Sequence, residues 1–169
     1  MAKTIQGCST LALGAAALAL AAPAGARTID SWEVVSDGKH CTMTSTFADN
    51  VSIGLIWAPK TGELAFMTAV PHLKELRGQA IAPVELTFDG TGPYTQWEDQ
   101  RATIVTGLDN DALIANWGPA HADELAKAVN AAGHVSVRVG GREIGTYDLS
   151  GSPAAYRELT HCGSQLAAK

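Results

Sequence analysis

The sequence feature that most constrains the fold is an alternation of apolar and polar residues that recurs along the chain after residue 30. In residues 40–47, HCTMTSTF, every second residue belongs to one face: Cys41, Met43, Ser45 and Phe47. A period of two is typical of a β-strand with one buried face. Comparable runs, separated by turn residues, lie at 51–57, 63–70, 83–90, 101–108, 111–117 and 134–149. We therefore expect eight to ten short strands in two antiparallel sheets or one strongly bent sheet.

One of these runs differs from the others, because residues 63–70, ELAFMTAV, are apolar on both faces. Strands that are buried on both sides have this composition, so we expect a central strand here. Residues 63–90 and residues 111–141 both follow the order strand, helical segment, strand. This similarity indicates either an internal duplication or two similar units without a common origin.

Two helices are expected in the second half of the chain. Gly118-Pro119 opens the first, since proline is favoured at the first helical position. Its apolar stripe has helical spacing, and Gly133 is a natural end. The stripe consists of Ala122, Leu125, Val129 and Ala132.

The second helix is expected near the C-terminus, after residues 134–149. Ser152 is a residue type that caps helix N-termini, and Pro153 follows it. One face of this helix would carry Ala155, Leu159, Cys162 and Leu166. Strands and helices together predict a single α+β domain with two main helices.

The first 26 residues have the three parts of a secretory signal peptide. Lys3 provides a positive start, residues 11–22 are small and apolar, and Ala24-Gly25-Ala26 matches a cleavage site. The apolar stretch is shorter than the ~20 residues that a membrane span needs. We therefore expect removal of residues 1–26, Cys8 included, and a domain at 27–169 in the periplasm or outside the cell. We expect no stable membrane insertion after cleavage.

Charge argues against some classes of partner. Residues 27–169 contain 11 Lys and Arg residues and 17 Asp and Glu residues, a net charge of −6. A mildly acidic protein with scattered basic residues is a poor ligand for nucleic acid or an anionic membrane. We expect no nucleic-acid partner.

Two His-Cys steps, His40-Cys41 and His161-Cys162, raise the question of a metal site. Zinc and copper favour Cys and His ligands. However, neighbouring residues of a strand point to opposite faces, and neighbouring helix residues diverge by about 100°. The two side chains of each His-Cys step therefore cannot easily bind one metal ion. Exported proteins lie in oxidising compartments, and two cysteines allow one connectivity. We expect a Cys41–Cys162 disulfide, with free thiols as the alternative and His40 and His161 as a weak candidate metal or pH-sensing pair.

The aromatic residues suggest a binding surface. Tyr94 and Trp97 lie beside two carboxylates in TGPYTQWEDQ, residues 91–100. Aromatic rings can stack on a sugar or a partner while carboxylates form hydrogen bonds. Trp117, before the first helix, either caps the core or lines a groove. We take Tyr94, Trp97 and Trp117 as candidate ligand-binding residues, against the alternative of a solvated loop whose Trp covers a core edge.

No motif identifies a catalytic group. The G-x-S-x-G, H-E-x-x-H, P-loop and dinucleotide patterns are all missing from the sequence. Catalytic residues therefore stay unassigned, and no cofactor is expected. A small glycan-active or hydrolytic enzyme remains an alternative that would need two carboxylates, or a His and a carboxylate, in one cleft.

The ends of this domain resemble a family of exported proteins. Trp32 begins the first long strand, a cysteine follows nine residues later, and the chain closes with YDLSGSPAAYRELTHC, residues 147–162. This layout is similar to small envelope proteins of alphaproteobacteria, loosely the invasion-associated locus B family. The resemblance implies a periplasmic or secreted location and carries over Cys41 and Cys162 alone, as a disulfide. We expect a non-enzymatic envelope protein that binds a macromolecule, such as an envelope protein or a glycan, or supports the envelope.

Overall fold

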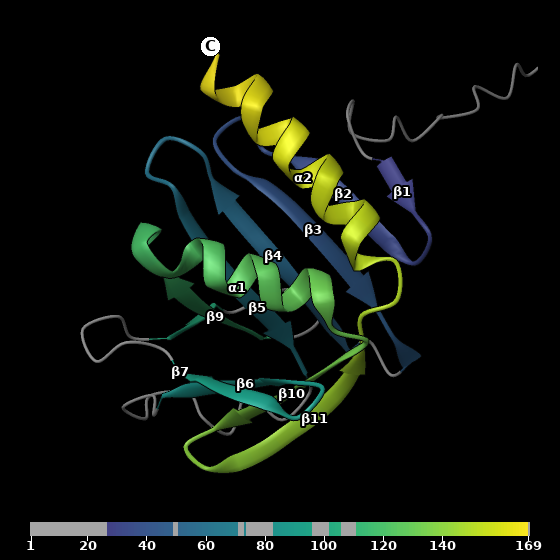
Figure 1. Ribbon diagram of the computed structural model, residues 1–169, viewed down its shortest axis with the longest axis vertical. Helices are drawn as coiled ribbons and strands as arrows, with labels where there is room; N and C mark the ends of the chain where they lie inside the picture. Colours follow the sequence, from purple (N-terminus) through teal and green to yellow (C-terminus); the bar gives the residue numbers. More distant parts are fainter. Residues whose placement is uncertain are drawn as a thin grey trace, which may run out of the picture.

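The computed structural model describes residues 27–48, 51–70, 73, 83–95, 102–105 and 111–168. These residues form two helices and eleven strands, and the strands make two antiparallel sheets (Figure 1). The expected α+β fold is confirmed. The described residues form eleven strands where eight to ten are expected, because they include two strands of only three residues each, β1 (Arg27–Ile29) and β8 (Thr103–Val105).

The larger sheet has seven strands, and most of its neighbours are joined by hairpins. In spatial order it contains β1 (Arg27–Ile29), β2 (Trp32–Ser36), β3 (Cys41–Thr46), β4 (Ser52–Ala58), β5 (Glu63–Ala69), β9 (Ala112–Trp117) and β8 (Thr103–Val105). Strand β5, the run that is apolar on both faces, is an interior strand of this sheet, with β4 and β9 as its neighbours.

The smaller sheet has four strands and an inner face of apolar residues. Its spatial order is β11 (Arg142–Asp148), β10 (His134–Val139), β6 (Val84–Phe88) and β7 (Thr91–Thr95). The similar segments 63–90 and 111–141 both begin in the larger sheet and end in the smaller one. Their first strands pair antiparallel, β5 with β9, and so do their last strands, β6 with β10.

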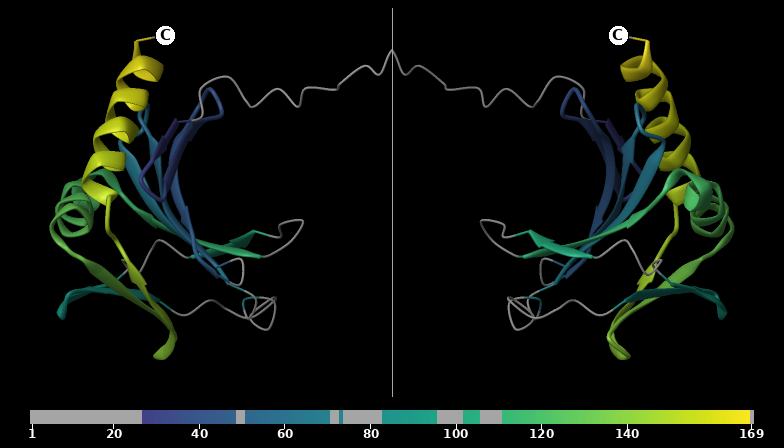
Figure 2. Two further views of the ribbon diagram at one scale, coloured as in Figure 1. Left: turned by 90° about the vertical axis from the view of Figure 1, so that its right-hand side faces the viewer. Right: turned by 90° about the vertical axis from the view of Figure 1, so that its left-hand side faces the viewer.

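Both helices cover the same side of the larger sheet (Figures 1 and 2). Helix α1 (Pro119–Ala131) packs on β5 and β9, and α2 (Ser152–Ala167) packs on β2, β3 and β4. The expected stripes face the core, since Leu125, Val129 and Leu159 are at most 2% exposed. Among the described residues, no helix is both long enough and apolar enough for a membrane span.

The start of α2 differs from the expectation. Gly151 is the N-cap residue, with a φ of 83°, and no side chain caps the helix. Ser152 is instead the first helical residue and is fully buried. Its hydroxyl donates a hydrogen bond to the carbonyl oxygen of Val129 in α1, at 3.0 Å. Ser152 therefore joins the two helices, because a glycine already provides the left-handed turn before α2.

The core fills the space between the helices, the inner face of the larger sheet and the inner face of the smaller sheet. It includes the residues that alternation placed inward, among them Cys41, Met43, Ile53, Leu55, Val84, Leu86 and Phe88. Tyr147 of β11 packs against Phe47, which follows β3, with ring centroids 5.7 Å apart. This contact joins the two sheets.

All four sheet edges have features that hinder pairing with another chain. Strands β1 and β8 are three residues long, and β7 contains Pro93, which has no backbone N–H. The pairing of β11 with β10 shifts register next to Val137 and Arg138. Short strands, proline and bulges all protect edges from strand addition.

Candidate functional site

The two cysteines form the predicted disulfide. Cys41 begins β3 and Cys162 lies in α2, and their Cα atoms are 6.1 Å apart. Cys41 is fully buried and Cys162 is half-buried. Because each sulfur is bonded to the other, neither can supply a thiolate ligand. The disulfide therefore ties the C-terminal helix to the first long hairpin.

Close packing surrounds this disulfide. Trp57 of β4 is the register partner of Cys41, and Gly163 follows Cys162 in α2. A Cβ atom added to Gly163 would lie 2.9 Å from both Cδ1 and Nε1 of Trp57. The helix backbone can approach the indole ring because residue 163 has no side chain.

The histidines beside the cysteines are engaged locally. The Asp37 carboxylate accepts hydrogen bonds from the backbone N–H groups of Lys39 and His40 and lies 3.0 Å from His40 Nδ1. These bonds, with the His40 side chain first, hold the pKa of Asp37 well below its usual range. His161 Nε2 lies 3.0 Å from Gln165 Nε2, one turn along α2. Within the described part of the chain, no three His, Cys, Asp or Glu residues are placed to hold a metal ion.

The predicted aromatic surface is not assembled in the described residues. Trp117 is 2% exposed and lies on the inner face, opposite Leu64. It is therefore a core residue, because strand alternation turns it toward the helices. The Tyr94 side chain and the whole of Trp97 lie outside the described part of the chain. Trp32 is also in the core, and its Nε1 donates a hydrogen bond to the Ser150 carbonyl oxygen at 2.9 Å.

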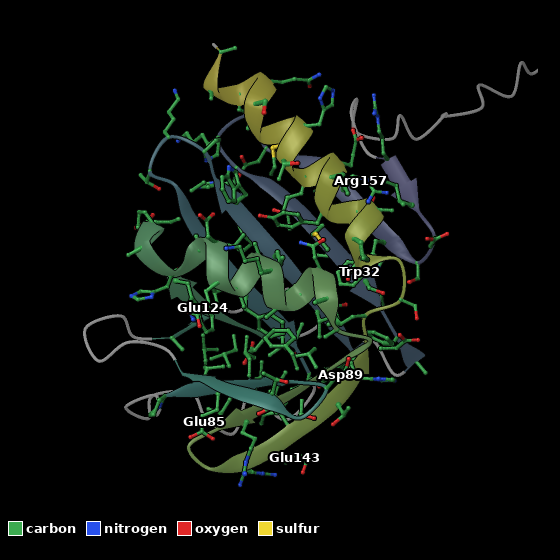
Figure 3. The ribbon with its side chains drawn as sticks, viewed as in Figure 1. Trp32, Glu85, Asp89, Glu124, Glu143 and Arg157 are labelled. Carbon is green, nitrogen blue, oxygen red and sulfur yellow. A yellow bond between two sulfur atoms is a disulfide. The ribbon has the colours of Figure 1, made fainter. Side chains whose placement is uncertain are left out.

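Asp89 lies where α1 ends and β10 begins (Figure 3), and it forms an Asp–His pair with His134, the first residue of β10. Asp89 Oδ2 accepts a hydrogen bond from Gly133 N at 2.7 Å, and Oδ1 accepts one from His134 N at 3.0 Å. His134 Nδ1 lies 3.4 Å from Asp89 Oδ1. These bonds, that from Gly133 first, lower the pKa of Asp89, so the carboxylate anchors the backbone.

A nearby serine raises the question of hydrolytic chemistry, which requires a hydroxyl bonded to an imidazole. Ser136 lies two residues after His134 on the same face of β10. Its hydroxyl, however, lies 2.7 Å from the Thr146 hydroxyl, and no hydrogen bond joins it to His134 among the described side chains. The arrangement therefore fits a polar sheet surface.

The outer face of the smaller sheet is polar across β6, β10 and β11. One row across β6, β10 and β11 contains Thr87, Ser136 and Thr146. The next row contains Glu85, Arg138 and Glu143. Figure 3 shows Glu85 and Glu143 pointing away from the helices. A surface of this kind is well solvated and needs no cover.

The outer face of the larger sheet is different, because apolar side chains gather at its centre. We call this group the outer patch: Ile56 of β4, Ala65 and Met67 of β5, and Ile114 of β9. Ile56, Met67 and Ile114 are half-buried, and none of the four belongs to the core cluster or packs against it. Figure 2 shows both helices on the opposite side of the sheet.

Register places the members of the outer patch side by side. Ile56 is opposite Ala65, and Met67 is opposite both Gly54 and Ile114. A Cβ atom at Gly54 would overlap the Met43 carbonyl oxygen and lie 2.8 Å from Thr44 Cγ2. Because residue 54 has no side chain, the patch is compact and nearly flat at this position. The apolar composition of both faces of residues 63–70 was the sequence signal for it.

The surroundings of the outer patch include hydroxyl, amide and carboxylate groups beside small apolar side chains such as Ala69 and Ala112. Thr42, Thr44 and Asn116 occupy neighbouring positions on the same face. Glu33 lies in the row of Met67, three strands away, and Glu63 lies four residues before Met67 on β5. The outer-face positions of β2, β3, β4, β5 and β9 include no Lys or Arg.

Comparisons with known proteins identify no relative of this chain. No protein-family model matches the chain, and neither the curated proteins nor the solved structures give a significant match. The likeness to the invasion-associated locus B family therefore stays a prediction.

Proposed function

We propose that this chain is an exported envelope protein, periplasmic or secreted, that binds another macromolecule without catalysing a reaction on it. The observation that carries the proposal is the outer patch. Ile56, Met67 and Ile114 are partly exposed on a face that neither helix covers. Apolar groups gathered on a surface, with a polar rim, are typical of interaction sites.

Three features support export. The first 26 residues have the composition of a secretory signal. Cys41 and Cys162 are joined in a disulfide, which is stable in oxidising compartments. The layout of residues 147–162 resembles that of exported alphaproteobacterial proteins.

The hydrolytic and metal-binding alternatives have less support. Asp89 is occupied by two backbone N–H groups, and the Ser136 hydroxyl is paired with Thr146. His40 and His161 each bond within their own hairpin or helix. These side chains stabilise local structure, so the outer patch is the better candidate for function.

The test uses a photo-reactive amino acid at position 67, introduced into the full-length chain and expressed in a Gram-negative host. We expect the protein in the periplasmic or medium fraction, with light-dependent covalent adducts to a macromolecule. The same amino acid at position 146, on the polar face of the smaller sheet, is the matched control and should give no adduct. Retention in the cytoplasm, or equal adducts at both positions, would show the proposal to be wrong.

A further inference from the structure

We infer that the outer patch binds an amphipathic α-helix of another exported protein, one whose apolar stripe is flanked by basic residues. This inference rests on the proposed function and names the class of partner. The size of the face, the state of the sheet edges and the charges around the outer patch support it.

The face is too small for a stable pair of identical subunits. From β2 to β9 it spans four strand spacings, about 19 Å, and β4 and β5 have seven residues each, about 23 Å. Two such faces in contact would bury roughly 900 Å² in total by these spacings, below the about 1,200–2,000 Å² of stable interfaces. A second copy would also bring its own Glu33 and Glu63 against an acidic face. A helix on the same face buries no more, so its binding belongs to the weak, transient class.

The form of the partner follows from the edges. An extended peptide binds a sheet by adding a strand to an edge. Here β1 and β8 are three residues long, β7 contains Pro93, and β11 shifts register against β10. A helix needs no edge, because it packs its apolar stripe on the face. About 15 residues of helix match the ~23 Å length of β4 and β5, at 1.5 Å per residue.

The charges around the outer patch indicate which residues should flank the apolar stripe of the partner helix. Glu33 and Glu63 are the charged residues at the outer-face positions of β2, β3, β4, β5 and β9, and both are exposed. Glu63 accepts a hydrogen bond from the Thr61 hydroxyl at 2.9 Å, which keeps its carboxylate at the rim. Lys or Arg beside the apolar stripe would complement these carboxylates, and acidic residues would be repelled.

The experiment compares two synthetic 15-residue helical peptides with the same leucine stripe. One has Lys at its polar positions and the other has Glu. The exported, oxidised protein is labelled with ¹⁵N and titrated with each peptide at low salt. We expect the Lys peptide to shift backbone amides of β4, β5 and β9, and to bind about fivefold or more tightly than the Glu peptide, as two rim charges allow.

Variants separate the apolar contribution from the charge contribution. Met67→Gln keeps the side-chain length but removes apolar contact, and should weaken Lys-peptide binding about tenfold. Ile114→Thr is a second variant with the same expected direction. Thr146→Gln, on the outer face of the smaller sheet, is the matched control and should change nothing. The double variant Glu33→Gln/Glu63→Gln should abolish the preference for Lys over Glu.

The outcomes distinguish this inference from the proposed function. The inference is overturned if neither peptide binds, if the shifts lie away from the outer patch, if the Glu peptide binds as tightly, or if light scattering shows a dimer that Met67→Gln dissociates. Light-dependent adducts at position 67 in cells, without peptide binding, would support the proposed function but would rule out a helical partner. Retention of the protein in the cytoplasm would contradict the proposed function itself.

Discussion

Gly163 is the residue at which helix α2 comes closest to the larger sheet. A glycine within a helix normally costs stability, so replacement by alanine usually stabilises a protein by about 0.5–1 kcal/mol. Here a Cβ atom would lie 2.9 Å from two atoms of the Trp57 indole ring. Real Cβ contacts are longer, so the helix or the ring would have to move.

We predict that Gly163→Ala lowers the free energy of unfolding by about 1–3 kcal/mol, because of overpacking against Trp57. Urea denaturation of the oxidised protein measures the change. Ser164→Ala, at the next and exposed position of α2, is the matched control and should change stability by less than about 0.5 kcal/mol. A Gly163→Ala variant more stable than the parent would contradict this close packing of α2 on Trp57.

Asp89 makes stability depend on pH. Its pKa is lowered from the ordinary 3.8 by the bond from Gly133 N, with a further bond from His134 N. A carboxyl whose pKa is lower in the folded state stabilises the fold above its unfolded pKa, and this contribution disappears as pH falls through the folded value. Asp89→Asn should therefore lower the melting temperature at pH 7. The gap to the parent should close in a series of melts toward pH 2, and a gap independent of pH would show that the charge has no role.

At the scale of elements, the disulfide between β3 and α2 is the strongest single constraint. The cysteines are 121 positions apart, so the bond closes a very long loop of the unfolded chain. Cys41→Ala/Cys162→Ala should lose about 3–5 kcal/mol of unfolding free energy, by the chain-entropy estimate. Denaturation of the parent with and without a reducing agent gives the same comparison without mutation. The reducing agent should leave the double variant unchanged.

The elements themselves were largely predictable from the sequence. Alternation identified the inward residues of β3, β4 and β6, because each strand has one face against the core and one face outside it. The helical stripes of α1 and α2 were equally clear. The sequence predicts Ser152 as a cap, and this prediction is wrong. The sequence does not show that Gly151 turns the chain or that Val129 of α1 lies within reach of the Ser152 hydroxyl.

The candidate site was less predictable than the fold. The sequence suggests an aromatic surface of Tyr94, Trp97 and Trp117, yet Trp117 lies in the core opposite Leu64. Neighbourhood in sequence does not determine which face of a sheet a residue occupies once the sheets are assembled. The outer patch depends on β5 pairing with β4 on one side and with β9 on the other. Strand β9 is far from β4 and β5 in the sequence. Such pairing cannot be deduced from periodicity alone.

At the scale of the whole molecule, the first described strand begins directly at the predicted cleavage point, with Arg27 as its first residue. Arg27 pairs with Val34 of β2 and forms an ion pair with Glu158 of α2 at 2.6 Å. We predict that the exported protein begins at Arg27, as measured by intact mass. Ala26→Tyr should leave the precursor uncleaved, because signal cleavage requires a small residue there. An exported parent protein that keeps residues 1–26 would disprove the signal-peptide assignment.

The Cys41–Cys162 bond also makes the enclosed polypeptide a covalent ring. Every strand from β3 to β11, and helix α1 as well, lies between its two ends. A protease that cuts any one loop of that ring opens it without releasing a fragment, so a nicked molecule keeps all its parts at the effective concentration of the intact one. Closure also has to wait for Cys162, which follows every strand in the sequence. An incomplete chain that stops before α2 can never close this ring, and its Cys41 stays available to the thiol chemistry of its surroundings.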